Sequence, residues 1–136
     1  MIISFTGTRE GMTVAQKQLV AYLLTKFKTI SYVKHGDCLG ADADFDAIAT
    51  ELKLSRHIFP ANIPAMRAYC DSRGAFLAKY PLPPLERNKL IIAGSNYLIA
   101  CPKGPEQLRS GTWSTIRAAH KLNLKTSTIY PDGTVL

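Results

Sequence analysis

The feature that most constrains the fold of this chain is an alternation of short apolar runs with longer amphipathic segments. The runs are rich in β-branched and aromatic residues, which favour strands. Because strands that alternate with helices form right-handed βαβ units, the pattern predicts a mainly parallel sheet covered on both faces. Five runs are expected to be strands: Ile2 to Thr6, Ile30 to Lys34, Arg56 to Phe59, Tyr97 to Cys101 and Thr126 to Tyr130.

The segments between these runs predict four helices. The first covers Thr13 to Lys28, where Thr13 and Gln16 have the spacing of a capping box. The others are expected at Ala41 to Leu52, Leu85 to Ala93 and Trp113 to Leu122. The expected fold class is therefore α/β, a Rossmann-like three-layer sandwich around a parallel sheet of about five strands in the order 3-2-1-4-5.

One connection is too long to lack structure of its own. It runs from Phe59 to Leu82, and within it we expect Pro64 to Phe76 to form a short helix or a lid.

Composition narrows the class of protein. With 136 residues, 46% of them apolar, the chain suits a single domain over residues 1–136. It contains no run of about 18 apolar residues and no basic leader, so we expect a cytoplasmic protein without membrane contact. Cys38, Cys70 and Cys101 match no metal, haem or redox motif, so we expect free thiols and neither metal nor cofactor. The formal charge of +7 favours anionic partners, which include a small phosphate ligand, nucleic acid and plain counter-ions.

Ligands of such folds bind beyond the carboxyl ends of the strands, so the turns after the strands are the candidate sites. After the first strand, Gly7 and Thr8 expose amides and Arg9 can grip a phosphate with its guanidinium. An equally simple interpretation is a tight turn with a solvent-facing arginine.

The turn after the second strand, His35 to Asp42, places Gly36 and Gly40 around a helix start, where free amides attract anions. Asp37 or Asp42 is a candidate to accept hydrogen bonds from a ribose or base, although Asp42 also suits a helix cap. His35 is expected to be structural.

Two further groups lie later in the chain. Arg87, next to Asn88, shares a helical face with apolar residues, so its guanidinium needs an anion or solvent; pairing with Glu86 is the alternative. Ser110, Gly111 and Thr112 stand directly before the last helix and predict a phosphate cradle, with ordinary N-capping as the alternative.

In combination, these motifs resemble the SLOG superfamily of Rossmann-like proteins over nearly the whole chain, and most closely its small stand-alone YspA-like members. The segments that carry the resemblance are Gly7-Thr8-Arg9, His35-Gly36 with Gly40-Ala41-Asp42, Phe59-Pro60-Ala61, Arg87-Asn88 with Ile92, and Ser110-Gly111-Thr112. The superfamily often forms dimers, so the resemblance implies self-association.

One branch, the LOG phosphoribohydrolases, cleaves the N-glycosidic bond of nucleoside monophosphates. The active-site pattern of this branch is P-G-G-x-G-T-x-x-E with an arginine upstream of it. The resemblance matches Arg87 to that arginine and Gly111-Thr112 to the G-T of the pattern. Thr115 stands at the position of the glutamate. Catalysis of this kind would use Arg87 on the phosphate and another acid, Glu106 or Asp37, to assist water.

A second branch, DprA, binds single-stranded DNA, and the segment from Arg87 to Gly94 is close to its R-N-R-I-I-A-G. Single-stranded nucleic acid is therefore the alternative partner. The primary prediction is a small nucleotide-like ligand bound at the carboxyl edge of the sheet, for sensing, sequestration or hydrolysis.

Overall fold

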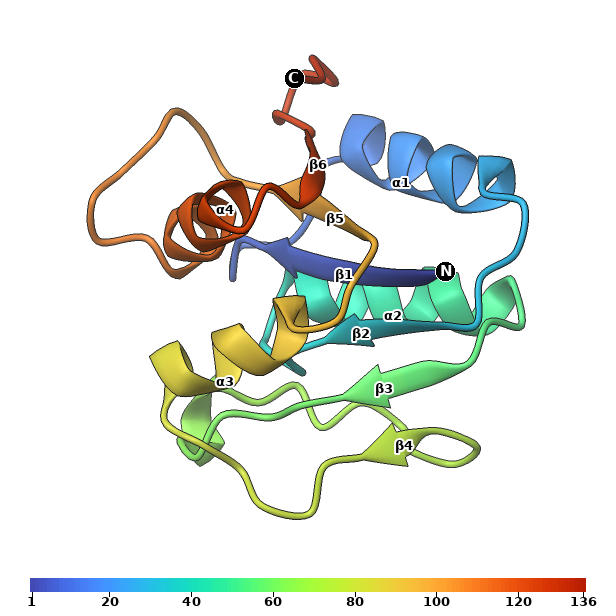
Figure 1. Cartoon of the computed structure of the whole chain (residues 1–136), viewed down its shortest axis with the longest axis vertical. Coiled ribbons are helices and arrows are strands. Elements are labelled where there is room, and N and C mark those ends of the chain that lie inside the picture. The colour runs from blue at the N-terminus through green and yellow to red at the C-terminus, as the bar shows by residue number, and fades with distance from the viewer.

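The protein is described by a computed structural model that covers all of residues 1–136. A six-stranded parallel sheet in the order β4-β3-β2-β1-β5-β6 forms its centre (Figure 1). The strands are β1 (Ile2–Gly7), β2 (Tyr32–His35), β3 (Arg56–Ile58), β4 (Phe76–Leu77), β5 (Tyr97–Cys101) and β6 (Lys125–Thr128). The helices are α1 (Val14–Lys26), α2 (Ala41–Glu51), α3 (Pro84–Ile92) and α4 (Gly111–Lys121), with a 3-10 turn, η1 (Pro64–Met66).

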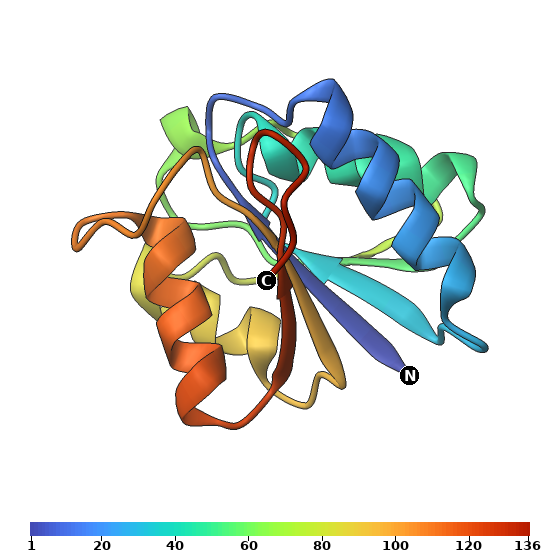
Figure 2. The ribbon, with the colours of Figure 1, turned by 90° about the horizontal axis from the view of Figure 1, so that it is seen from above.

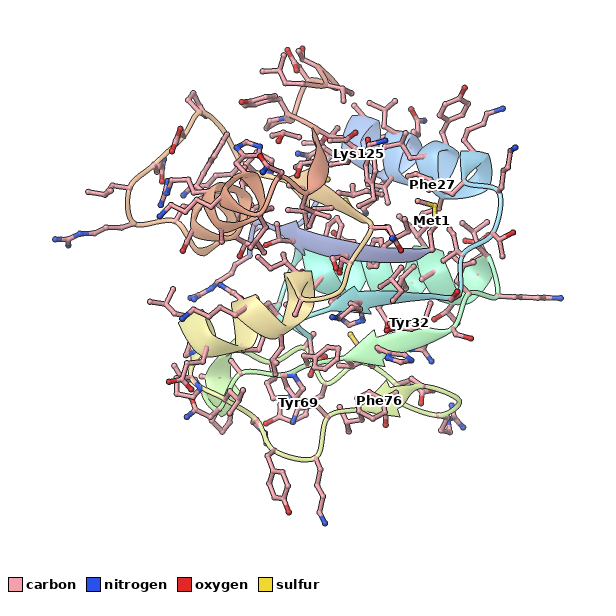
Figure 3. The ribbon with its side chains drawn as sticks, in the orientation of Figure 1. Met1, Phe27, Tyr32, Tyr69, Phe76 and Lys125 are labelled. Carbon is pink, nitrogen blue, oxygen red and sulfur yellow. The ribbon has the colours of Figure 1, made fainter.

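The α/β Rossmann-like class and the relative order of the five predicted strands are confirmed, and the sheet has six strands where about five were predicted. The additional strand, β4, lies at the edge of the sheet beside β3, where Phe76 and Leu77 pair with His57 and Ile58. Phe76 also packs on His57, whose ring stacks on Tyr32. Figure 3 shows the side chains of Phe76 and Tyr32 at this end of the sheet. A strand of two residues has no periodicity of its own, so this long-range pairing leaves no signal in the sequence.

The helices form two layers, one on each face of the sheet (Figure 2). Successive side chains of a strand point to opposite faces of the sheet, as Ser4 and Phe5 of β1 illustrate. Phe5 stacks on Phe45 of α2 with ring centroids 4.3 Å apart, whereas the Ser4 hydroxyl donates to the Ile91 carbonyl of α3. The larger core lies on the α1 and α2 side, and two small clusters pack under α3 and α4.

The helix starts follow the predicted capping chemistry. Thr13 and Gln16 form the expected capping box at α1. The side-chain Nε2 of Gln16 also donates to the carbonyls of Pro102 and Ile129. Ser110 caps α4 by accepting from the Trp113 amide at 3.2 Å. Both caps satisfy amides that would otherwise have no partner at a helix start.

The connection from β3 to α3 is tied to the turn after β2. Within Pro64 to Phe76, where a short helix or a lid was predicted, it contains a three-residue 3-10 turn, η1, and Phe76 begins β4. Arg67 Nε donates to Asp37 Oδ2 at 2.8 Å, and the Cys70 amide donates to Asp37 Oδ1 at 2.9 Å. The Leu39 amide donates to the Met66 carbonyl at 3.0 Å. All three cysteines are unpaired, and none of the helices has the length and hydrophobicity to traverse a bilayer.

Candidate functional site

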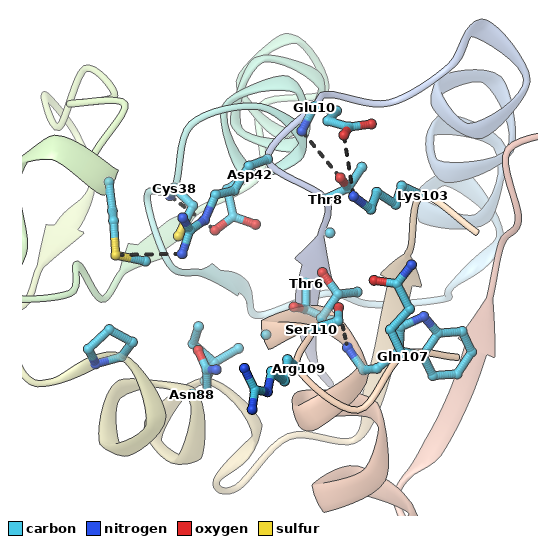
Figure 4. A pocket seen from close by; sticks show the side chains of 18 of the residues that line it. Thr6, Thr8, Glu10, Cys38, Asp42, Asn88, Lys103, Gln107, Arg109 and Ser110 are labelled. Carbon is cyan, nitrogen blue, oxygen red and sulfur yellow. Dashed lines mark hydrogen bonds and ion pairs between the residues drawn. The ribbon is translucent and has the colours of Figure 1, made fainter. Parts of the chain in front are cut away.

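A cavity of about 450 Å³ opens at the carboxyl ends of β1, β2 and β5, a volume within the range of small-ligand pockets (Figure 4). It lies where the strand order reverses, between β1 and β5. The structure brings nine of the predicted site residues together in its lining: Gly7, Thr8, Arg9, Asp42, Arg87, Asn88, Ser110, Gly111 and Thr112.

One wall of the cavity is the start of α4. The amides of Gly111 and Thr112 donate to no acceptor in the protein, and neither does the Thr112 hydroxyl, although that residue is only 8% exposed. No acidic residue occupies the first turn of this helix, and Arg109 stands just before its cap. Unpaired amides, a helix dipole and a nearby guanidinium all favour an anion here.

On another side of the cavity lies a buried cation. Arg87 is 4% exposed and belongs to no ion pair. Its guanidinium donates to the carbonyls of Gly36 and Phe59, to Asn88 Oδ1 at 2.9 Å and to Cys38 Sγ at 3.3 Å. The charge of Asp42 interacts with Arg87 but the two form no hydrogen bond, so a bound anion would give the buried guanidinium a direct partner.

Gly36 and Gly40 serve the packing of this region. A Cβ on Gly36 would lie 2.5 Å from Arg87 Nη1, so the glycine makes room for the guanidinium. A Cβ on Gly40, which has a φ of +87°, would lie 2.2 Å from the Arg9 carbonyl oxygen. Neither glycine lines the cavity, and the amide of the next residue, Ala41, is already bound to the Thr8 carbonyl at 2.9 Å.

Asp42 lines the cavity and at the same time orders the turn after β2. Its Oδ2 accepts from the amides of Gly36 and Cys38, each at 3.1 Å, while its Oδ1 has no partner in the protein. Burial raises the pKa of the Asp42 carboxyl, although the amides of Cys38 and Gly36 and the charge of Arg87 oppose this rise. The unpaired oxygen is an acceptor that a ligand hydroxyl can use.

The other two acids predicted as candidates lie outside the cavity lining. Asp37 is fully buried and bound to Arg67, and Glu106 pairs with Arg117 at 2.9 Å on the surface. Thr115, at the position where LOG enzymes have their glutamate, is 1% exposed and donates to the Gly111 carbonyl. The carboxylates that do line the cavity are Glu10 and Asp42.

Several lining residues were missed by the sequence analysis, among them Lys103, Gln107, Arg109 and Trp113. The position of Arg109 directly before a helix cap was the one usable signal. Four basic side chains and two carboxylates line the cavity, which leaves a formal excess of two positive charges.

A second polar cluster lies on the α2 face of the sheet. His35 Nε2 donates to Asp46 Oδ1 at 2.7 Å, while its Nδ1 accepts from the Asp37 amide at 3.0 Å, which fixes a neutral tautomer. Arg56 Nη1 binds both oxygens of Asp46, at 2.9 and 3.0 Å. The donor atoms of His35, Asp46 and Cys70 lie within 4.8 Å of one another, but burial raises the pKa of the Cys70 thiol and Arg56 already neutralises Asp46. These groups suit a closed structural network rather than a metal ion.

No protein-family model matches the chain, and no curated protein is similar to it. Among solved structures, it resembles the X-ray structure of TM1055, a structural-genomics target. The TM-score is 0.65 at 16% sequence identity, and the match covers 92% of this chain and 71% of TM1055. A likeness at this identity concerns the fold alone.

Proposed function

We propose that the protein binds the phosphate group of a nucleotide in the cavity at the carboxyl edge of its sheet. The observation that carries the proposal is the start of α4, where two amides and the Thr112 hydroxyl face the cavity without a partner. Phosphate oxygens are acceptors that these donors and Arg109 would satisfy together.

The rest of the cavity suits the nucleoside. Only 5 of its 21 lining residues are hydrophobic, so a polar ligand is favoured. The unpaired Oδ1 of Asp42 would accept from a ribose hydroxyl, and the side-chain NH₂ of Asn88, which has no partner in the protein, would donate to the phosphate or base. Membership of the SLOG superfamily is part of the proposal, and the Rossmann-like fold agrees with it.

Binding without LOG-type hydrolysis is the form of the function that we favour. The position of the LOG glutamate holds Thr115, whose hydroxyl is bound inside its own helix. Asp37 and Glu106 are engaged by arginines away from the cavity lining. Of the two carboxylates in the cavity lining, Glu10 is exposed and pairs with Lys103, so a hydrolytic reaction would have to use the buried Asp42. A sensing or sequestering role needs no such group.

The test is a thermal-shift screen of the purified protein against nucleoside monophosphates, ADP-ribose, cyclic nucleotides and a single-stranded oligonucleotide. A ligand that binds only the folded state raises the melting temperature. We expect a small nucleotide to do so, and Arg109→Gln to reduce the shift. Arg73→Gln is the matched control, because Arg73 is an exposed arginine outside the cavity lining.

Two results would reject the proposal. A shift unaffected by Arg109→Gln would place the ligand elsewhere. Stabilisation by the oligonucleotide alone, lost as salt rises, would favour the alternative function of single-stranded nucleic-acid binding, since that affinity depends on counter-ion release.

A further inference from the structure

We infer that the ligand carries two separated phosphate groups, one bound at the start of α4 and the second at Arg9 and Arg87. The matching chemical class is a nucleoside 3′,5′-bisphosphate, in which a ribose separates the phosphates. This inference rests on the proposed function, because the first phosphate is the one assigned there to α4.

The two anion-favouring regions lie on different strands of the sheet. The start of α4 follows β5, whereas Arg87 is bound to the Gly36 carbonyl in the turn after β2. β1 lies between β2 and β5, so the ends of these strands are about 10 Å apart at the usual strand spacing. Figure 4 shows Cys38 and Asp42 of the β2 turn across the cavity from Ser110 and Gln107.

Two arginines that form no ion pair, Arg9 and Arg87, line the cavity with the β2 turn. Arg87 is nine-tenths buried and lies 3.3 Å from Cys38 Sγ through its Nη2. Arg9 extends toward the same region from the loop after β1, and its Nη2 lies 3.7 Å from Met66 Sδ. Burial raises the pKa of the Cys38 thiol, and the positive charges of Arg87 and Arg9 oppose this rise. Neither belongs to an ion pair, and Asp42 uses one oxygen on backbone amides.

A single phosphate would not satisfy both regions. Charge-assisted hydrogen bonds to phosphate are about 2.7–2.9 Å long, so a group held by the Gly111 and Thr112 amides stays close to α4. Arg9 and Arg87 would then have no directly bound anion. A second phosphate, placed across the ribose from the first, supplies that anion and brings the sugar hydroxyl toward Asp42.

The experiment is calorimetric titration with adenosine 5′-monophosphate and adenosine 3′,5′-bisphosphate, repeated with the guanosine pair. We expect the bisphosphate of at least one base to bind about tenfold more tightly, as charge-assisted hydrogen bonds predict. Arg9→Gln should abolish most of this gain and weaken the monophosphate much less than the bisphosphate. Arg9 is chosen because it is exposed, so the variant keeps its fold, whereas truncation of the buried Arg87 threatens it.

The control variants separate the two proposals. Thr112→Val should lower the affinity for both monophosphate and bisphosphate, and Arg73→Gln should lower neither affinity. Equal affinity for monophosphate and bisphosphate, or an equal loss for both in Arg9→Gln, would overturn the inference and leave the proposed function standing. Absence of binding by all four nucleotides would overturn both. An affinity for 5′-phosphorylated oligonucleotides that grows with strand length would reject the free bisphosphate in favour of a nucleic-acid end.

Discussion

The starts of α2 and α4 lie at the same edge of the sheet and each contains a glycine, yet their surroundings differ. At α2, the Ala41 amide donates to the Thr8 carbonyl, and Asp42 binds the amides of Gly36 and Cys38. At α4, the first two amides and a threonine hydroxyl have no partner in the protein. The protein therefore binds the first amide of α2 itself and places a carboxylate beside it, whereas the first two amides of α4 stay available.

The glycines of the two turns show the same contrast. The position of a Cβ on Gly40 is filled by the backbone of Arg9, whereas a Cβ on Gly111 would meet nothing within 4 Å. At Gly40 the approaching group is the protein backbone itself, whereas the space beside Gly111 is not filled by the protein. Only the second case leaves space for a ligand.

The largest expected effect comes from the buried network that fastens α2 to the sheet. Asp46→Asn removes the charge that faces Arg56, which is 7% exposed, so the unfolding free energy should fall by about 3–5 kcal/mol. Urea unfolding measures this loss. Glu106→Gln, at an exposed ion pair near α4, is the control and should cost less than about 1 kcal/mol. Equal losses would show that the α2 network contributes no more than a surface pair.

The glycine contrast can be tested by the same substitution at both positions. Gly40→Ala should cost about 2–5 kcal/mol, because it combines an unfavourable backbone conformation with a clash against Arg9. Gly111→Ala should change stability by less than about 1 kcal/mol, since alanine favours the helix and meets no atom. Urea midpoints of the two variants give the comparison, and similar values would contradict it.

A smaller effect distinguishes a cap that serves only stability from one that also borders the ligand. Ser110→Ala and Thr13→Ala each remove an N-cap side chain and should each cost about 1 kcal/mol. Only Ser110→Ala should also weaken the nucleotide-induced thermal shift, because Ser110 lines the cavity. A loss of binding in Thr13→Ala at matched stability would show that helix fraying in general, and not the α4 site, controls affinity.

The smallest expected effect concerns pH. Burial raises the pKa of Asp42 above its usual 3.8, so the Asp42 carboxyl stays protonated to a higher pH in the folded state than in the unfolded chain. As pH rises above about 3.8, ionisation of Asp42 therefore lowers stability. The side chain in Asp42→Asn cannot ionise, so the variant does not lose stability in this way. The unfolding free energy of the wild type relative to the variant should therefore decline from pH 4 upward. A relative stability that increases over this interval would mean that the pKa of Asp42 is lowered instead.

Much of the fold was predictable because its signals are local. The capping box of Thr13 and Gln16 and the apolar runs of β1 and β5 depend on neighbours within a few residues. β4 was not predictable, because two residues become a strand only through pairing with His57 and Ile58. Likewise, Asp37 was indistinguishable from a ligand-binding acid until the structure placed Arg67 against it.

The sequence by itself determined the α/β alternation, the helix caps and the presence of glycine-rich turns at the carboxyl ends of the strands, because each depends on short-range backbone preferences. Only the tertiary structure decided which of these turns is closed and which is open. That outcome depends on contacts between distant segments, such as the Thr8 carbonyl on the Ala41 amide and the Gly36 carbonyl on Arg87. Hydrogen-bond donors are available to a ligand only where no such segment reaches them, and this depends on the arrangement of the whole chain.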